Sequence, residues 1–278
     1  MSKYNISTFT GKFGFENIAK AGFKVVDYSA CESYESGIFE ANDMVFNSFF
    51  ENEYKQLKEV GLNVELIHAP YNPPPDRVSD EQFDLFVKAV KRTFKICSIM
   101  NAPYLVIHPV IFPDWENNIQ RTKEINYRLF NEYCELAEKT DIIIAAENMP
   151  CRSVPYCDAT KMLELIDKIN SPRLGICLDT GHAHMSQESG VTVADMTRDI
   201  GKHLKALHIH DNDLSYDQHL PPFFGNLDWS GFMQALKDVE YKGAFNFEAS
   251  PRQVIPDELN LPFLQYLYKT AQELFDII

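Results

Sequence analysis

The sequence has no long hydrophobic run, and this absence excludes a transmembrane helix. Its longest purely aliphatic stretch is Ile142–Ala146, far below the roughly 18 residues that a membrane-spanning helix needs. The first residues, Met-Ser-Lys-Tyr-Asn, also lack the basic region and the apolar core of a signal peptide. We therefore expect a cytoplasmic protein with no membrane partner.

Cysteine is sparse, and its spacing is not that of a zinc-binding or disulfide-rich domain. The 278 residues include 6 cysteines, and no two of them form a C-x-x-C pair. Cys151 and Cys157 flank a short segment, which leaves a redox or metal pair open, but their spacing matches no familiar zinc motif. We expect free thiols in a reducing compartment.

Positive charge is also in short supply. The chain has 26 Lys and Arg against 40 Asp and Glu, for a formal net charge of −14. Surfaces that bind DNA are basic, so this balance makes nucleic acid an unlikely partner unless a bound metal or a local basic patch offsets it. The apolar share of 45% and the charged share of 24% are typical of globular proteins and exclude a disordered chain or a collagen-like fibre.

A nucleotide-binding fingerprint and any linker are missing as well. The segment after the first predicted strand, Thr10–Phe15, contains two glycines but no G-x-G-x-x-G, which disfavours a doubly wound open sheet. No low-complexity stretch interrupts the chain, so we expect residues 1–278 to form a single domain.

The chain does contain eight apolar runs of strand length, separated by longer amphipathic stretches. The runs are Tyr4–Phe9, Lys24–Tyr28, Val64–His68, Tyr104–His108, Ile142–Glu147, Leu174–Asp179, Leu204–His210 and Ala244–Glu248. The amphipathic stretches include Phe46–Val60, Asp80–Met100, Thr122–Lys139 and Ala159–Ile169. Eight strand–helix units of about 35 residues each predict an α/β fold, a single (β/α)8 TIM barrel.

Polar residues end six consecutive predicted strands. They are His68, His108, Glu147, Asp179, His208 with His210, and Glu248. The C-terminal ends of barrel strands converge on one face, where active sites are built. Three carboxylates and several imidazoles in one small volume repel or desolvate one another unless a cation holds them. We therefore expect a divalent metal, and this mixture of ligands suits Zn, Mn, Fe or Co better than Ca and leaves Mg open.

Each of these residues also has a simpler interpretation when taken alone. A strand-end histidine is usually a satisfied polar residue, Glu147 with Asn148 is a plausible capping pair, and Asp179 is well placed to turn the chain. Independent chance does not put such residues at six consecutive strand ends, and the metal interpretation rests on the whole set.

The same segments resemble the xylose-isomerase-like TIM barrels, a superfamily of sugar isomerases, ketose 3-epimerases, inosose dehydratases and endonuclease IV. The resemblance begins with the Gly-Phe-Lys-Val-Val-Asp segment that ends at Asp27 and covers nearly the whole chain. The matching segments are Ile67–Tyr71, Val106–Pro109, Ala146–Asn148, Cys177–Ala183, Leu207–Asp211 and Phe247–Glu248.

The resemblance to the epimerase and isomerase members implies a divalent metal and two catalytic carboxylates. The implied ligands are Glu147, Asp179, His208 and Glu248. Glu147 and Glu248 would remove and return a proton at a sugar carbon, while the metal stabilises the enediolate. His208 is preferred because the strand before it matches the family, but His210 shares its strand parity and stays an alternative.

Other polar and aromatic residues are assigned to the pocket by the same resemblance. His182 would hydrogen-bond a substrate oxygen, while His68 and His108 would line the pocket or orient their neighbours. Trp115 and the Phe223–Phe224 segment are candidates to pack against the sugar.

Endonuclease IV resembles the chain at all nine of its zinc-ligand positions. These map to His68, His108, Glu147, Asp179, His182, His208, Asp217, His219 and Glu248. A cluster of three metals of this kind activates water against a phosphodiester. The chain departs from that enzyme in having Leu214–Tyr216 where its Gly-Ser-Arg element stands, within a shorter loop.

We interpret the sequence as a divalent-metal-dependent isomerase or epimerase of a sugar or sugar phosphate, with Zn, Mn, Co or Mg as cofactor. The alternatives are a zinc-dependent phosphodiester hydrolase of the endonuclease IV type, an inosose-type dehydratase and a non-catalytic sugar-binding barrel. The expected partner is a small-molecule substrate. Homo-oligomers are common in the family, and the sequence fixes neither the oligomeric state nor the particular sugar.

Overall fold

The structure is a computed structural model that describes residues 4–11, 13–29, 31, 33–71, 73, 78–112, 114–150, 155–186 and 190–277. The side chain of Trp115 lies outside the described part, as does Cys151. The expectations for Trp115 and for the pairing of Cys151 with Cys157 therefore fall outside the described residues.

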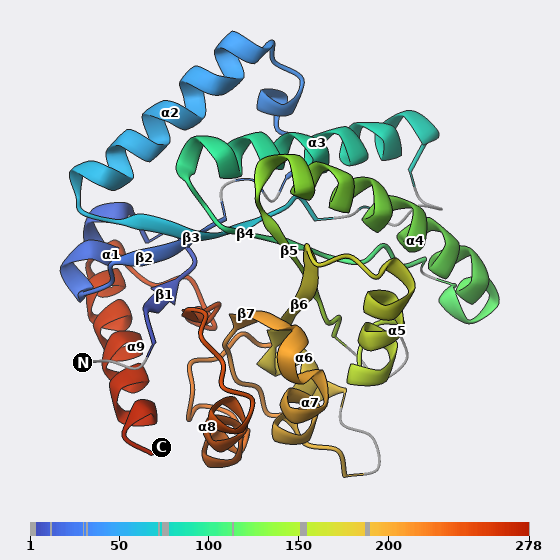
Figure 1. Cartoon of the computed structure of the whole chain (residues 1–278). Helices are drawn as coiled ribbons and strands as arrows, with labels where there is room; N and C mark the ends of the chain where they lie inside the picture. The colour runs from blue at the N-terminus through green and yellow to red at the C-terminus, as the bar shows by residue number, and fades with distance from the viewer. Residues whose placement is uncertain are drawn as a thin grey trace.

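Eight parallel strands form the wall of a barrel, as Figure 1 shows. They are β1 (Ile6–Thr8), β2 (Val25–Tyr28), β3 (Asn63–His68), β4 (Tyr104–Ile107), β5 (Ile143–Glu147), β6 (Leu174–Asp179), β7 (Leu204–His208) and β8 (Phe245–Phe247). Strands β2 to β7 form one sheet in sequential order, and β1 pairs with β8. Single bridges between Phe9 and Asp27 and between Ile209 and Phe247 join the two sheets and close the circle. The predicted TIM barrel is confirmed.

Helices surround the strands on the outside (Figure 1). They are α1 (Phe15–Ala21), α2 (Asp43–Glu59), α3 (Asp80–Met100), α4 (Trp115–Thr140), α5 (Ala159–Ile169), α6 (Thr180–Met185), α7 (Val193–Ile200), α8 (Trp229–Asp238) and α9 (Asn260–Phe275). Three short 3₁₀ turns are η1 (Gly37–Phe39), η2 (Gly201–His203) and η3 (Asp257–Leu259). No helix in the described part of the chain is long and apolar enough to cross a membrane.

Several predicted boundaries differ from the structure, and two of these differences have a clear physical reason. The strand expected over Leu204–His210 ends at His208, because the chain then leaves β6 and bridges to Phe247 instead. The helix expected from Thr122 already starts at Trp115, but Asn118 has non-helical angles (φ −118°, ψ 18°). The regular amphipathic pattern thus begins only after this kink. For this reason the start of α4 was predicted too late in the sequence.

Inside the barrel, a small apolar layer lies beneath the polar strand ends. It consists of Leu66, Val106, Ala145, Cys177, Ala206 and Ala244. Alternate residues of a strand face the same side of the sheet. Ala145, Cys177 and Ala206 are each two residues before a polar residue at the strand end, so this layer is the floor of the candidate site.

Candidate metal centre

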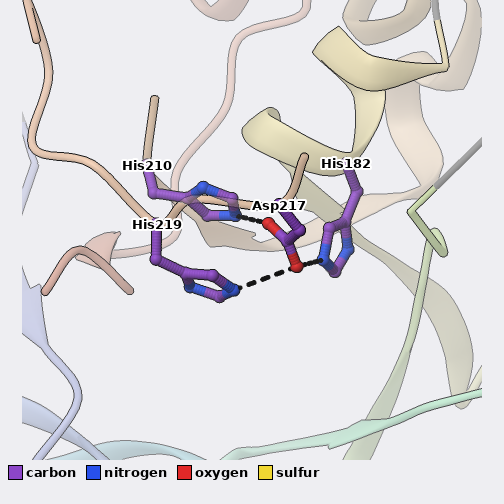
Figure 2. A group of neighbouring side chains, drawn as sticks. All are labelled: His182, His210, Asp217 and His219. Atoms are coloured by element: carbon purple, nitrogen blue, oxygen red, sulfur yellow. Dashed lines mark hydrogen bonds and ion pairs between the residues drawn. The ribbon is translucent and has the colours of Figure 1, made fainter. Parts of the chain in front are cut away.

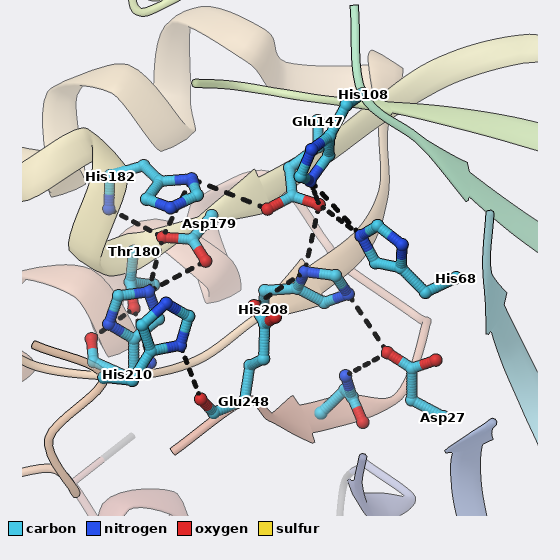
Figure 3. Close-up of polar contacts among 12 residues, drawn as sticks. Asp27, His68, His108, Glu147, Asp179, Thr180, His182, His208, His210 and Glu248 are labelled. Atoms are coloured by element: carbon cyan, nitrogen blue, oxygen red, sulfur yellow. Dashed lines mark hydrogen bonds and ion pairs between the residues drawn. The ribbon is translucent and has the colours of Figure 1, made fainter. Parts of the chain in front are cut away.

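Four strand-end residues meet above this floor, as the close-up in Figure 3 shows. Glu147 ends β5, Asp179 ends β6, His208 ends β7 and Glu248 directly follows β8. The first three side chains are completely or almost completely buried, and that of Glu248 is 13% exposed. One ligand atom of each residue lies within 4.8 Å of those of the other three. The barrel has brought together residues as far apart in the sequence as Glu147 and Glu248.

The imidazole of His208 is oriented by hydrogen bonding from below and faces two carboxylates above. Its Nε2 lies 3.1 Å from Oδ2 of Asp27, so we infer that Nε2 carries the proton and donates it to this carboxylate. The other nitrogen, Nδ1, lies 3.1 Å from Oε2 of Glu147 and 3.0 Å from Oε2 of Glu248. In this tautomer Nδ1 presents a lone pair, as a metal ligand does.

Buried atoms without hydrogen bonds provide a test of whether these residues fit a metal ion. Nδ1 of His208 and Oε2 of Glu248 are both buried and lie 3.0 Å apart, yet neither makes a hydrogen bond. Leaving buried polar atoms without a hydrogen bond is costly. Three carboxylates around one imidazole also carry more negative charge than the imidazole can balance. A divalent cation would satisfy both requirements, so the residues fit the ion that the family resemblance implies.

Asp27 is a functional candidate that the sequence analysis did not single out. It lies on β2, is 1% exposed, and accepts hydrogen bonds from Nε2 of His208 and from Nδ2 of Asn246, each at 3.1 Å. The sequence feature that could have identified Asp27 is a single carboxylate within the apolar run Lys24–Tyr28. Nothing local indicated that this carboxylate meets a histidine 181 positions further along the chain.

We expect Asp27→Ala to weaken divalent-ion binding by roughly 10- to 100-fold, the usual effect of losing a residue that orients a metal-binding histidine. Without Asp27, His208 is free to rotate or to place its proton on Nδ1. Asp27→Asn retains an oxygen acceptor and should recover most of the affinity. Isothermal titration with Zn²⁺ or Mn²⁺ measures this, and equal losses in both variants would contradict the role of Asp27 in orienting His208.

A second group of ligand atoms adjoins the first and shares Glu147 with it. Nε2 of His68 and Nε2 of His108 lie 3.3 Å and 3.1 Å from Oε2 of Glu147. Burial alone would raise the pKa of Glu147, but the charges of His208 and His108 hold it well below its ordinary value. Burial opposes protonation of His68 too, yet its hydrogen bond to Glu147 raises its pKa to about 9. Glu147 is therefore ionised and bridges two sets of imidazoles.

A third group, which is partly exposed at Asp217 and His219, is drawn in Figure 2. Oδ2 of Asp217 is 3.1 Å from Nε2 of His182 and 3.2 Å from Nε2 of His219. The ring of His210 stacks on that of His219 with centroids 4.1 Å apart. Despite burial, the charge of Asp179 and the hydrogen bond to Asp217 raise the pKa of His182 to about 10. The hydrogen bond to Asp217 raises the pKa of His219 to about 10 as well. These four side chains also have ligand atoms within 4.8 Å of one another.

His210, the alternative to His208, takes a different position from it. Its Nε2 lies 2.9 Å from Oδ2 of Asp179, and its peptide N–H and C=O are both bonded to the hydroxyl of Thr180. His210 therefore orients Asp179 and lines the third group, whereas His208 faces Glu147 and Glu248. This arrangement is consistent with the choice of His208 as ligand, which remains a prediction.

The Asp-Thr-Gly-His motif has a steric reason for its glycine. A Cβ on Gly181 would lie 1.9 Å from Cε1 of the His210 ring, far inside van der Waals contact. We expect Gly181→Ala to push His210 away from Asp179 and to reduce divalent-ion affinity by at least roughly tenfold. Gly190→Ala is not a useful control because its φ is +87°, so Gly37→Ala, with open space around it, is preferable. Unchanged ion affinity in Gly181→Ala would refute this account.

The structure gives the positions of the predicted aromatic segment and of Cys157. Phe223 and Phe224 lie on the segment after β7 and are 55% and 63% exposed. Their side chains are thus available at the surface, but their packing against a sugar is untested. Cys157 is buried, as expected for a free thiol.

The family model of the xylose isomerase-like TIM barrel matches residues 15–266. The chain therefore belongs to this family, as the fold and the strand-end residues predict.

Individual relatives include proteins of different function. The chain is 28% identical over 186 residues to an uncharacterized protein of Methanocaldococcus jannaschii, covering 66% of this chain and 63% of the relative. It is 25% identical over 177 residues to a probable endonuclease 4 of Mesomycoplasma hyopneumoniae, covering 60% and 59%. It is 29% identical over 130 residues to a D-psicose 3-epimerase of Enterocloster bolteae, covering 46% and 40%. The matches thus span less than two thirds of these relatives.

Solved structures with a similar fold include sugar epimerases and a protein described as epimerase-like. A D-tagatose 3-epimerase-like protein superposes with a TM-score of 0.75 at 19% identity, covering 99% of this chain and 98% of the other. A D-psicose 3-epimerase crystallised in the presence of D-fructose gives 0.71 at 16% identity, covering 98% and 97%. At these identities the likeness establishes the barrel alone.

Proposed function

We propose that the chain is a divalent-metal-dependent isomerase or epimerase of a sugar or sugar phosphate. The observation that carries this proposal is the placement of Glu147 and Glu248, whose Oε2 atoms lie 3.1 Å and 3.0 Å from the same nitrogen of His208. Two carboxylates from separate strands of the mouth, β5 and β8, beside one ion site, are suited to remove and return a proton at a single carbon.

The ion would be held by Glu147, Asp179, His208 and Glu248. When bound, it supplies electrostatic stabilisation to the negative charge that develops on the substrate oxygens as a proton leaves the adjacent carbon.

The carboxylates of Glu147 and Glu248 differ in solvent accessibility, and this difference indicates which proton-transfer role each would take. The side chain of Glu147 is 1% exposed, whereas that of Glu248 is 13% exposed, although its Oε2 is buried against His208. The carboxylate of Glu248 is therefore the better placed of the two to exchange a proton with a substrate at the mouth. Glu147 would act on the opposite side of the same carbon, and His182 would donate a hydrogen bond to a substrate oxygen.

A second candidate function is a phosphodiester hydrolase with three metal ions. The observation that favours it is the presence of three neighbouring donor groups, two of which share Glu147. Three adjacent ions would stabilise the attacking and leaving oxygens of a phosphate ester. Against this candidate stands the net charge of −14, which repels a long polyanion outside the metal centre.

The number of bound ions and the substrate together distinguish the two candidates. Protein purified without added metal is analysed for metal content. It is then assayed for solvent-deuterium incorporation into ketoses and inositols, and for cleavage of a duplex with an abasic site. We expect about one firmly held ion per chain and exchange at carbon with Mn²⁺, Co²⁺, Mg²⁺ or Zn²⁺ supplied in turn. Near three zinc ions with duplex cleavage would replace the sugar proposal by the hydrolase.

The variant Asp217→Asn sharpens this comparison because Asp217 belongs only to the third donor group. If the proposed epimerase is correct, deuterium exchange should fall by less than roughly tenfold, since the ion of the first group is retained. A hydrolase that needs the third ion would lose nearly all of its turnover.

A further inference from the structure

Cys177 lies directly beneath the proposed metal centre. It is two residues before Asp179 on β6, so both side chains face the barrel interior. The thiol is completely buried and belongs to the apolar floor. The other five members of this layer have hydrocarbon side chains: Leu66, Val106, Ala145, Ala206 and Ala244. Cys177 is therefore the member of this layer whose side chain contains a heteroatom, its sulfur.

The sulfur has two polar neighbours, and both are proposed metal ligands. In the ladder between β5 and β6, Glu147 is paired with Cys177. A carboxylate oxygen of Glu147, a ring nitrogen of His208 and Sγ of Cys177 all lie within 4.8 Å of one another. The ligand atoms of a zinc ion with bonds of about 2.0–2.3 Å are somewhat closer together than this. A modest adjustment of side chains would bring the sulfur into coordination.

A second observation is that Nδ1 of His208 faces carboxylate oxygens, at 3.1 Å from Glu147 and 3.0 Å from Glu248, without making a hydrogen bond to either. His208 is completely buried, and its Nδ1 makes no hydrogen bond. Cys177 is paired with Ala206 in the ladder between β6 and β7, so it places a sulfur atom where the neighbouring strand has only a methyl group. The sulfur occupies the boundary between the hydrocarbon floor and the ligand atoms.

We propose that Cys177 supplies a sulfur ligand to the ion bound by Glu147 and His208 and so makes the centre selective for thiophilic ions. Sulfur ligands favour Zn²⁺, Co²⁺ and Cd²⁺, whereas Mg²⁺ and Mn²⁺ prefer oxygen. This inference rests on the proposed metal-dependent function and adds to it which class of ion the site prefers.

The test compares the wild-type protein with Cys177→Ala and Cys177→Ser, in the absence of any sugar. Cys97→Ala is the matched control, because Cys97 is equally buried but lies on α3 away from the site. Each protein is freed of metal with a chelator and titrated with Co²⁺ while the near-ultraviolet spectrum is recorded. Competition with Zn²⁺ and direct titration with Mg²⁺ give the relative affinities.

We expect a sulfur-to-cobalt charge-transfer band in the wild type and in Cys97→Ala, and its loss in both Cys177 variants. The affinity for Zn²⁺ should fall by at least roughly tenfold in these variants, while that for Mg²⁺ changes by less than about twofold. Serine has nearly the size of cysteine, so agreement between Cys177→Ser and Cys177→Ala excludes a packing defect as the cause.

Two results would overturn the inference. Cobalt that binds without a charge-transfer band, or with a band that survives in Cys177→Ala, would show that Cys177 is not a ligand, and the proposed metal-dependent reaction would be unaffected. Failure of the wild type to bind any divalent ion would overturn both the inference and the metal premise of the proposed function.

Discussion

Replacement of Glu248 by glutamine should abolish the exchange of a sugar carbon-bound proton with solvent. Glutamine has the size of glutamate but cannot accept a proton, so no other group replaces the carboxylate of Glu248 in the step assigned to it. Losses on removal of a general acid or base are typically 10²- to 10⁴-fold, and we expect a loss of about that size. Solvent-deuterium incorporation, followed by NMR on a ketose that the wild type exchanges, measures it.

The control for this variant is Glu258→Gln, the same substitution at an exposed glutamate of η3, ten positions further along the chain. It should leave exchange unchanged. Metal content should be determined for both variants, because Glu248 is also a proposed ligand. A Glu248→Gln protein that retains its ion and exchanges protons at the wild-type rate would show that the two-carboxylate mechanism is wrong.

Removal of divalent ions should abolish turnover and lower the free energy of unfolding. Without an ion, the buried carboxylates of Glu147 and Asp179 and the partly exposed one of Glu248 balance their charge only with nearby imidazoles. An ion present at roughly a thousandfold excess over its Kd stabilises the folded state by about 4 kcal/mol. We expect a chelator to lower the melting temperature by several degrees, and re-added ion to restore both stability and exchange.

The pH dependence of ion binding provides a related check. In the metal-free protein the pKa of His68 is about 9 and those of His182 and His219 are about 10. Protons therefore compete with ions below these values, and the apparent affinity should rise as the pH increases toward about 9. An affinity that falls over this range, or a melting temperature that chelation leaves unchanged, would argue against an ion among these imidazoles.

Much of the fold and the principal strand-end residues followed from local patterns. Apolar runs alternating with amphipathic stretches are a consequence of burying strands on both faces beneath helices, so all eight strands could be located. The residues ending β3 and β5 to β7 were identified because charged or imidazole groups interrupt otherwise apolar runs. The exact limits were less predictable: His108 lies one residue past β4, and β1 is only Ile6–Thr8, because ladder pairing rather than composition decides where a strand ends.

The sequence alone therefore determined the barrel and the convergence of its polar strand ends on one face, since both depend on periodicity and on topology. Tertiary structure decided which atoms of those residues meet. The tautomer of His208 depends on Asp27, the position of His210 depends on Gly181, and the sulfur of Cys177 reaches Glu147 and His208 only because neighbouring strands share a register. These contacts are a few ångströms long and are made between residues that lie far apart in the sequence. No local sequence pattern therefore encodes them.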